Sequence, residues 1–128
     1  MMVLRLTAGA VALLAAACAA HAQSKLTRVP VQDVRVLMVA AIDSPTGDAY
    51  GLLASKDADQ ITQHFRASGP ILIDVTTERR YQQRGCSRLK VSFAQEGVHL
   101  PGAAKPERRS IDFGLNYCRD GTPPKSLI

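Results

Sequence analysis

The sequence predicts a small α+β domain with a mainly antiparallel sheet in β-α-β-β-β order, one helix on one face and one disulfide. Two runs near the C-terminus, residues 86–93 and 110–118, alternate apolar and polar side chains as half-buried strands do. An amphipathic stretch over residues 57–66 has the spacing of a short helix. Cys86 and Cys118 stand at matching ends of the two runs, so one hairpin register pairs both the apolar residues and the cysteines.

Residues 1–22 have the pattern of a secretory signal peptide. Arg5 precedes an apolar run over residues 8–20, and Ala20-His21-Ala22 matches the small-x-small rule for cleavage. The run is shorter than the roughly 20 residues that a spanning helix needs, so we expect a mature chain without a transmembrane segment. Residues around Cys18 also resemble a bacterial lipobox, and a lipid anchor at Cys18 is the alternative to cleavage after Ala22. Both interpretations place the protein in the periplasm.

Removal of the signal peptide leaves one domain's length of chain. We expect an N-terminal arm over residues 23–33, a disulfide-stapled domain over residues 34–118 and an extended tail over residues 119–128. The arm is polar, contains Pro30 and is interpreted as a tether or an edge-pairing segment. Cys86 and Cys118 remain after cleavage, and an even pair in an oxidising compartment predicts a disulfide.

The elements follow in chain order. Residues 34–42 are apolar with β-branched residues at both ends, which predicts a mostly buried strand. Turn formers fill residues 43–48, and residues 49–54 are interpreted as a short strand after that turn. The helix over residues 57–66 has acids in its first turn, Arg66 in its last, and either Ser55 or Asp57 as its cap.

The remaining strands complete the sheet. Residues 71–77 alternate as a strand, and the helix before them suggests a β-α-β start with parallel strands. In the hairpin, the register that pairs the cysteines places three apolar pairs on one face: Leu89 with Leu115, Val91 with Phe113, and Phe93 with Ile111. The opposite face is polar and should meet water. The loop over residues 97–109 is long for a hairpin, and such loops are either functional or mobile.

No catalytic constellation is evident in the sequence. His64 and His99 lack the spacing of a metal-binding pair, and the serines lie in neither a nucleophile elbow nor an S-x-x-K motif. We therefore predict a non-enzymatic protein with no cofactor and no metal. The alternative is a small secreted enzyme or enzyme inhibitor with an unrecognised site, which a pocket containing one of these histidines beside a carboxylate would favour.

Positive charge is concentrated in the C-terminal half. Residues 23–78 contain five Lys or Arg against seven Asp or Glu, whereas residues 79–128 contain ten against four. Such a surface suits an anionic partner, for example an acidic protein face or nucleic acid crossing the envelope, while a merely solvated charged face is the alternative. Tyr81 and Tyr117 could add stacking or interface area. The candidate anionic-partner face comprises Arg79, Arg80, Arg84, Arg88, Lys90, Arg108 and Arg109.

Several short strings in the chain carry a family resemblance. They are Thr77-Glu78-Arg79-Arg80-Tyr81, Gly85-Cys86-Ser87-Arg88-Leu89, Gln95-Glu96-Gly97-Val98 with Leu100-Pro101-Gly102, and residues 113–121 from Phe113 to Gly121. Over residues 34–125 the chain resembles small uncharacterised exported proteins of proteobacteria, which are associated with conjugative or type IV secretion gene clusters. The resemblance implies a periplasmic accessory role in a transfer apparatus, with an envelope protein as partner, and it implies no reaction and no site residues.

Overall fold

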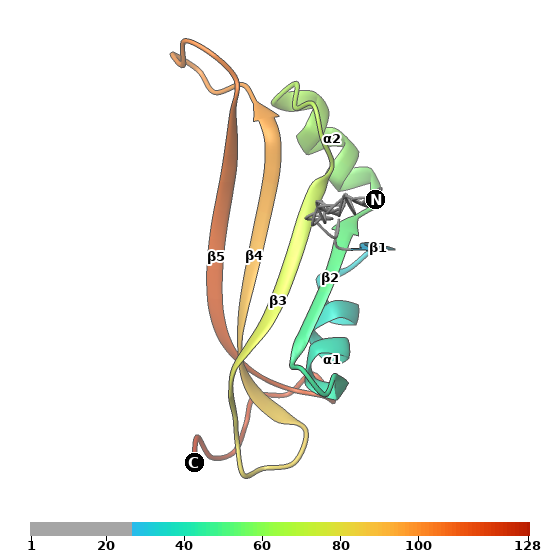
Figure 1. Cartoon of the computed structure of the whole chain (residues 1–128), viewed down its shortest axis with the longest axis vertical. Helices are drawn as coiled ribbons and strands as arrows, with labels where there is room; N and C mark the ends of the chain where they lie inside the picture. The colour runs from blue at the N-terminus through green and yellow to red at the C-terminus, as the bar shows by residue number, and fades with distance from the viewer. Residues whose placement is uncertain (1–26) are drawn as a thin grey trace, which may run out of the picture.

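The computed structural model describes residues 27–128, so the predicted signal peptide and Cys18 lie outside the described residues. Five strands form one sheet whose spatial order equals their order in the chain, and two helices accompany it (Figure 1). The predicted α+β class with a mainly antiparallel sheet is confirmed, since only β1 and β2 run parallel. The elements are β1 (Val29–Val31), α1 (Val34–Asp43), β2 (Asp48–Leu53), α2 (Lys56–His64), β3 (Ile71–Arg80), β4 (Cys86–Val98) and β5 (Glu107–Cys118).

The predicted hairpin register is confirmed. Strands β4 and β5 pair antiparallel with Cys86 opposite Cys118, and the three predicted apolar pairs lie opposite each other. The predicted disulfide between Cys86 and Cys118 is present, and each cysteine is only 3% exposed. The bridge therefore joins the end of β5 to the start of β4 inside the protein.

The strand predicted over residues 34–42 is wrong, because these residues form helix α1. The Asp33 side chain caps the helix by accepting from the backbone N–H of Arg35 at 2.8 Å. The buried residues are Leu37, Met38, Ala41 and Ile42, which is the spacing of one helical face. Such a short apolar run fits a buried strand and a helix equally well until a cap and a neighbouring surface decide.

The predicted β-α-β-β-β order with one helix is also corrected, to β-α-β-α-β-β-β. The arm supplies β1, which pairs parallel with β2 so that α1 makes the parallel crossover. The helix predicted over residues 57–66 is present as α2, and it is capped by Ser55. It does not join parallel strands, because β2 and β3 on either side of it are antiparallel.

The core lies between α1 and one face of the sheet. Ile73, Val75 and Leu89 are completely buried, and they form one cluster with the buried face of α1. Figure 1 shows α1 and α2 near opposite ends of the sheet, with β5 at the edge farther from both. Most of β5 is consequently exposed, from Glu107 to Gly114.

The C-terminal tail folds back on the β3–β4 turn. The Ile128 carbonyl accepts from the backbone N–H of Gln82, and the side-chain oxygen of Gln83 accepts from the N–H of Lys125. Among residues 27–128, no helix combines the length and the apolar character needed to span a membrane.

Candidate functional site

The seven basic residues of the predicted anionic-partner face lie at three separate places. Four lie on the sheet face opposite the α1 core: Arg79, Arg88, Lys90 and Arg108. Two lie at the end of the sheet where α1 terminates: Arg80 and Arg84. One, Arg109, borders an apolar groove beside β5.

Two of these arginines face each other across the β3–β4 pair. Arg79 lies opposite Arg88. The guanidinium carbon of Arg79 lies 5.5 Å from the ring centroid of Tyr81. The Tyr81 hydroxyl donates to Oδ1 of Asn116 at 2.6 Å, and Arg88 donates to the same oxygen at 3.4 Å. No ion pair to a carboxylate reaches either arginine within the described chain. Opposed like charges repel, and no carboxylate partner among residues 27–128 offsets that repulsion at Arg79 and Arg88.

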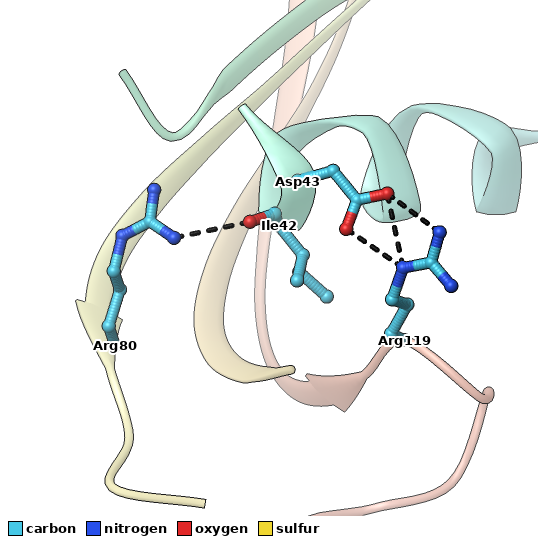
Figure 2. Close-up of polar contacts among 4 residues, drawn as sticks. All are labelled: Ile42, Asp43, Arg80 and Arg119. Atoms are coloured by element: carbon cyan, nitrogen blue, oxygen red, sulfur yellow. Dashed lines mark hydrogen bonds and ion pairs between the residues drawn. The ribbon is translucent and has the colours of Figure 1, made fainter. Parts of the chain in front are cut away.

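Arg80 stabilises the end of helix α1. Its two terminal guanidinium nitrogens donate, Nη1 to the carbonyl oxygen of Ile42 at 3.1 Å and Nη2 to that of Ser44 at 2.7 Å. Figure 2 shows Arg80 approaching the helix end from β3, while Arg119 approaches from the other side. A cation at a helix C-terminus satisfies carbonyls that have no partner within the helix and interacts favourably with the helix dipole. Arg80 is therefore already engaged in holding the fold.

Arg119 makes a bidentate ion pair with Asp43, the last residue of α1. Its Nε and Nη2 atoms donate to the two carboxylate oxygens at 2.8 and 3.0 Å (Figure 2). Hydrogen bonding from Arg119 lowers the pKa of Asp43 below its ordinary value and raises the pKa of Arg119 itself. Arg80 and Arg119 line a cleft of about 330 Å³ at this end of α1, and Arg84 lines it as well. Of these three arginines, Arg80 binds carbonyl oxygens of Ile42 and Ser44, and Arg119 binds the carboxylate of Asp43.

The other basic residues of the predicted face are paired with carboxylates on the surface. Exposed pairs of this kind contribute little to stability but do compensate charge locally. The pairs are Lys90 with Asp112 at 3.8 Å, Arg108 with Glu96, and Arg109 with Glu107 at 3.3 Å.

The two histidines of the alternative, enzymatic interpretation lie on neighbouring segments, because the backbone N–H of His99 donates to the carbonyl oxygen of Phe65 at 3.0 Å. His64 ends α2 and His99 follows β4; both are exposed, and neither lines the groove or the cleft. Within residues 27–128, no three His, Cys, Asp or Glu side chains gather closely enough to hold a metal ion. The Tyr117 side chain is partly buried against the core cluster.

An apolar groove that the sequence interpretation missed lies between α2 and the sheet. Its volume is about 480 Å³, within the range of ligand-binding pockets. Phe93 and Ile111 line it, and they share a sheet face with Leu89, which packs against α1. The groove is therefore the part of the apolar face that α1 leaves open. Its other lining residues include Leu53, Ile61, Phe65, Ile71, Val98 and Leu100.

Beside the groove, β5 forms a long free edge of the sheet. Ile111 and Phe113 are 56% and 49% exposed, which is unusual for large apolar side chains in the middle of a strand. The other edge strand, β1, has only three residues and contains Pro30, which has no N–H to offer. Long, apolar edge strands attract another strand unless they are covered.

The backbone of β5 offers hydrogen-bonding groups in a defined pattern. The N–H of Cys118 donates to the carbonyl of Thr122 instead of to β4, so the pair with Cys86 is a non-hydrogen-bonded pair. Its Cα–Cα distance of 4.0 Å agrees with that type of pair. Because the pattern alternates along an antiparallel strand, Ser110 and Asp112 also direct N–H and C=O away from β4. The free edge thus carries donors and acceptors ready for a further strand.

Comparison of the chain with protein-family models, with curated protein sequences and with solved structures found no match to any of the three.

Proposed function

We propose that this chain is a non-enzymatic accessory protein of the bacterial periplasm, which binds a protein partner by adding an extended segment of that partner to the free edge of β5. The observation that carries the proposal is the exposed edge from Glu107 to Gly114 beside an open apolar groove.

Strand addition uses the two features that β5 combines. The outward N–H and C=O groups give main-chain hydrogen bonds, while alternate side chains of the added segment select the partner. On one face these side chains would meet Ile111 and Phe113 and the groove behind them. On the other face they would meet charged residues such as Arg108 and Asp112. We therefore expect a partner segment that alternates apolar and charged residues.

The compartment rests on two independent features. The predicted signal peptide directs export, and the Cys86–Cys118 disulfide is typical of proteins in oxidising compartments. The resemblance to exported proteins of conjugative or type IV secretion clusters suggests that the partner belongs to such an apparatus in the envelope.

Site-specific photo-crosslinking in living cells tests the proposed edge. Phe113 replaced by p-benzoylphenylalanine should crosslink to a protein after irradiation, because the edge is occupied in the assembled state. Val36, on the exposed side of α1, is 59% exposed and provides a matched apolar control that should not crosslink. Equal crosslinking from both positions, or none from Phe113, would contradict the proposed edge.

Binding of an anionic polymer is a second candidate, favoured by the uncompensated pair Arg79 and Arg88. If nucleic acid binds there, its affinity should fall steeply with salt concentration. The double substitution Arg79→Glu and Arg88→Glu should abolish that binding, whereas Arg80 is left intact because it holds α1. Salt-independent retention of single-stranded DNA, or retention by the double variant, would remove this candidate.

A further inference from the structure

We infer that the partner at the β5 edge is a second copy of this chain, so that two β5 strands pair antiparallel across a two-fold axis and the two sheets become one. This inference rests on the proposed function of the edge and names its occupant. A two-fold interface requires a surface that complements itself, because each residue meets the same set of residues from the other copy.

The charges of β5 complement themselves in one register. If Ser110 of the two copies lies opposite itself, Arg108 of each copy lies opposite Asp112 of the other. Centring the pair on Arg109 or on Asp112 would instead place identical charges opposite each other, which is destabilising. Centring it on Ile111 would place Arg108 opposite Gly114 and lose the charge pair. The arrangement about Ser110 is therefore the favoured register.

This register also extends ion pairs that already exist in one chain. Lys90 pairs with Asp112, and Glu96 pairs with Arg108, all on the sheet face opposite α1. Pairing Asp112 with Arg108 of the second copy would join these two pairs into one row of alternating charge. The row would occur twice, once on each side of the two-fold axis. Networks of this kind are more favourable than isolated surface pairs.

The opposite face of the interface is apolar. Ile111 of the two copies would be diagonal neighbours across the new pair of strands, within reach of each other. The aliphatic part of Arg109 would lie opposite Ile111 of the second copy and cover it. The new strand pair would therefore shield the exposed Ile111 of each copy beside its groove.

Sedimentation of the exported protein with its disulfide intact tests the inference. We expect a reversible dimer at about 100 μM, a concentration that would reveal even a weak, micromolar association. Ser110→Pro should yield a monomer with an unchanged circular dichroism spectrum, because the Ser110 N–H faces the free edge and proline is tolerated there. Ser110→Ala is the control and should dimerise like the unmodified protein. A monomeric unmodified protein, or a dimer that survives Ser110→Pro, overturns the inference.

Charge exchange tests the register. Arg108→Asp alone and Asp112→Arg alone should each weaken dimerisation about tenfold, because each places two like-charge pairs in the interface. Mixing the two variants should restore association, since the aspartate introduced at position 108 of one chain then meets the arginine introduced at position 112 of the other. Failure of the mixture to associate more tightly than either variant would overturn the register.

The crosslinking experiment separates this inference from the proposed function. A crosslink from position 113 to a second copy supports both. A crosslink solely to a different protein overturns the second copy and leaves the edge as a binding site, whereas no crosslink overturns both.

Discussion

The disulfide is expected to supply a large share of the stability of this domain. Cys86 and Cys118 are 32 residues apart in the sequence, and a bond closing a loop of that length contributes about 3.7 kcal/mol by reducing the entropy of the unfolded chain. Small domains are stable by roughly 5 to 15 kcal/mol, and this one is near the lower end of domain size. Replacing both cysteines by alanine should therefore lower the free energy of unfolding by about 3 to 4 kcal/mol.

Urea denaturation followed by circular dichroism measures this loss. The oxidised protein and the double alanine variant are compared, and the single variant Cys86→Ala should lose about as much as the double variant because either change removes the bond. A loss below about 1 kcal/mol would refute the chain-entropy reasoning. It would indicate that the hairpin of β4 and β5 persists in the unfolded ensemble, since Cys86 and Cys118 are direct neighbours across that hairpin.

Three further predictions concern the helix-covered face and the end of α1. Leu89→Ala should lower the free energy of unfolding by about 2 to 5 kcal/mol in urea denaturation because Leu89 is fully buried, whereas Phe113→Ala, at a half-exposed site, should cost less than about 1 kcal/mol. Arg80→Met should cost about 1 kcal/mol in the same assay, since it removes two hydrogen bonds from the exposed end of α1. Asp43→Asn should lower the thermal midpoint at neutral pH. Because Arg119 depresses the pKa of Asp43, this ion pair stabilises the folded state above about pH 4 and is lost as the pH falls through the depressed pKa.

Each of these has an outcome that would contradict it. Equal costs for Leu89→Ala and Phe113→Ala would mean that the edge is as well packed as the core. Arg79→Met is the control for Arg80→Met, because Arg79 makes no contact with α1 carbonyls; equal losses would remove the capping role. A difference between Asp43→Asn and the unmodified protein that persists unchanged to about pH 2 would show that the ion pair is not its cause.

The hairpin could be predicted because two independent constraints agree on it. The alternation of apolar and polar residues in the two strands indicates which side chains share a face. A register shift of one residue would turn every apolar residue of a strand outward. The cysteines then exclude the remaining registers. Such agreement between local pattern and covalent chemistry makes Cys86 opposite Cys118, and Val91 opposite Phe113, predictable from the sequence alone.

For helix α1, the sequence pattern alone does not decide between a helix and a strand. Its apolar residues satisfy a buried strand and a helix alike, and the decision depends on the Asp33 cap and on a sheet surface assembled from distant strands. Likewise, the basic residues cluster in the sequence but separate in space. Arg79 and Arg80 are adjacent in the chain, yet one lies over Tyr81 and the other holds α1, because successive residues of a strand point to opposite faces.

The groove and the free edge were missed because they are defined by what does not cover them. The sequence shows that Phe93, Ile111 and Phe113 share an apolar face, and it predicts a helix on that face. The sequence does not indicate how much of the strands a helix covers, because this depends on the length of the helix and on the angle at which it packs on the sheet. In the folded chain α1 covers Leu89 and Val91, and the groove remains at the other end.

By itself, then, the sequence determined the α+β class, the register of the hairpin and the disulfide, because strand alternation and cysteine pairing are local or pairwise properties. Only the tertiary structure decided which part of the apolar face is covered, which arginines are engaged, and that β5 ends the sheet. These properties depend on the placement of every other element, and they are the ones from which a binding surface is made.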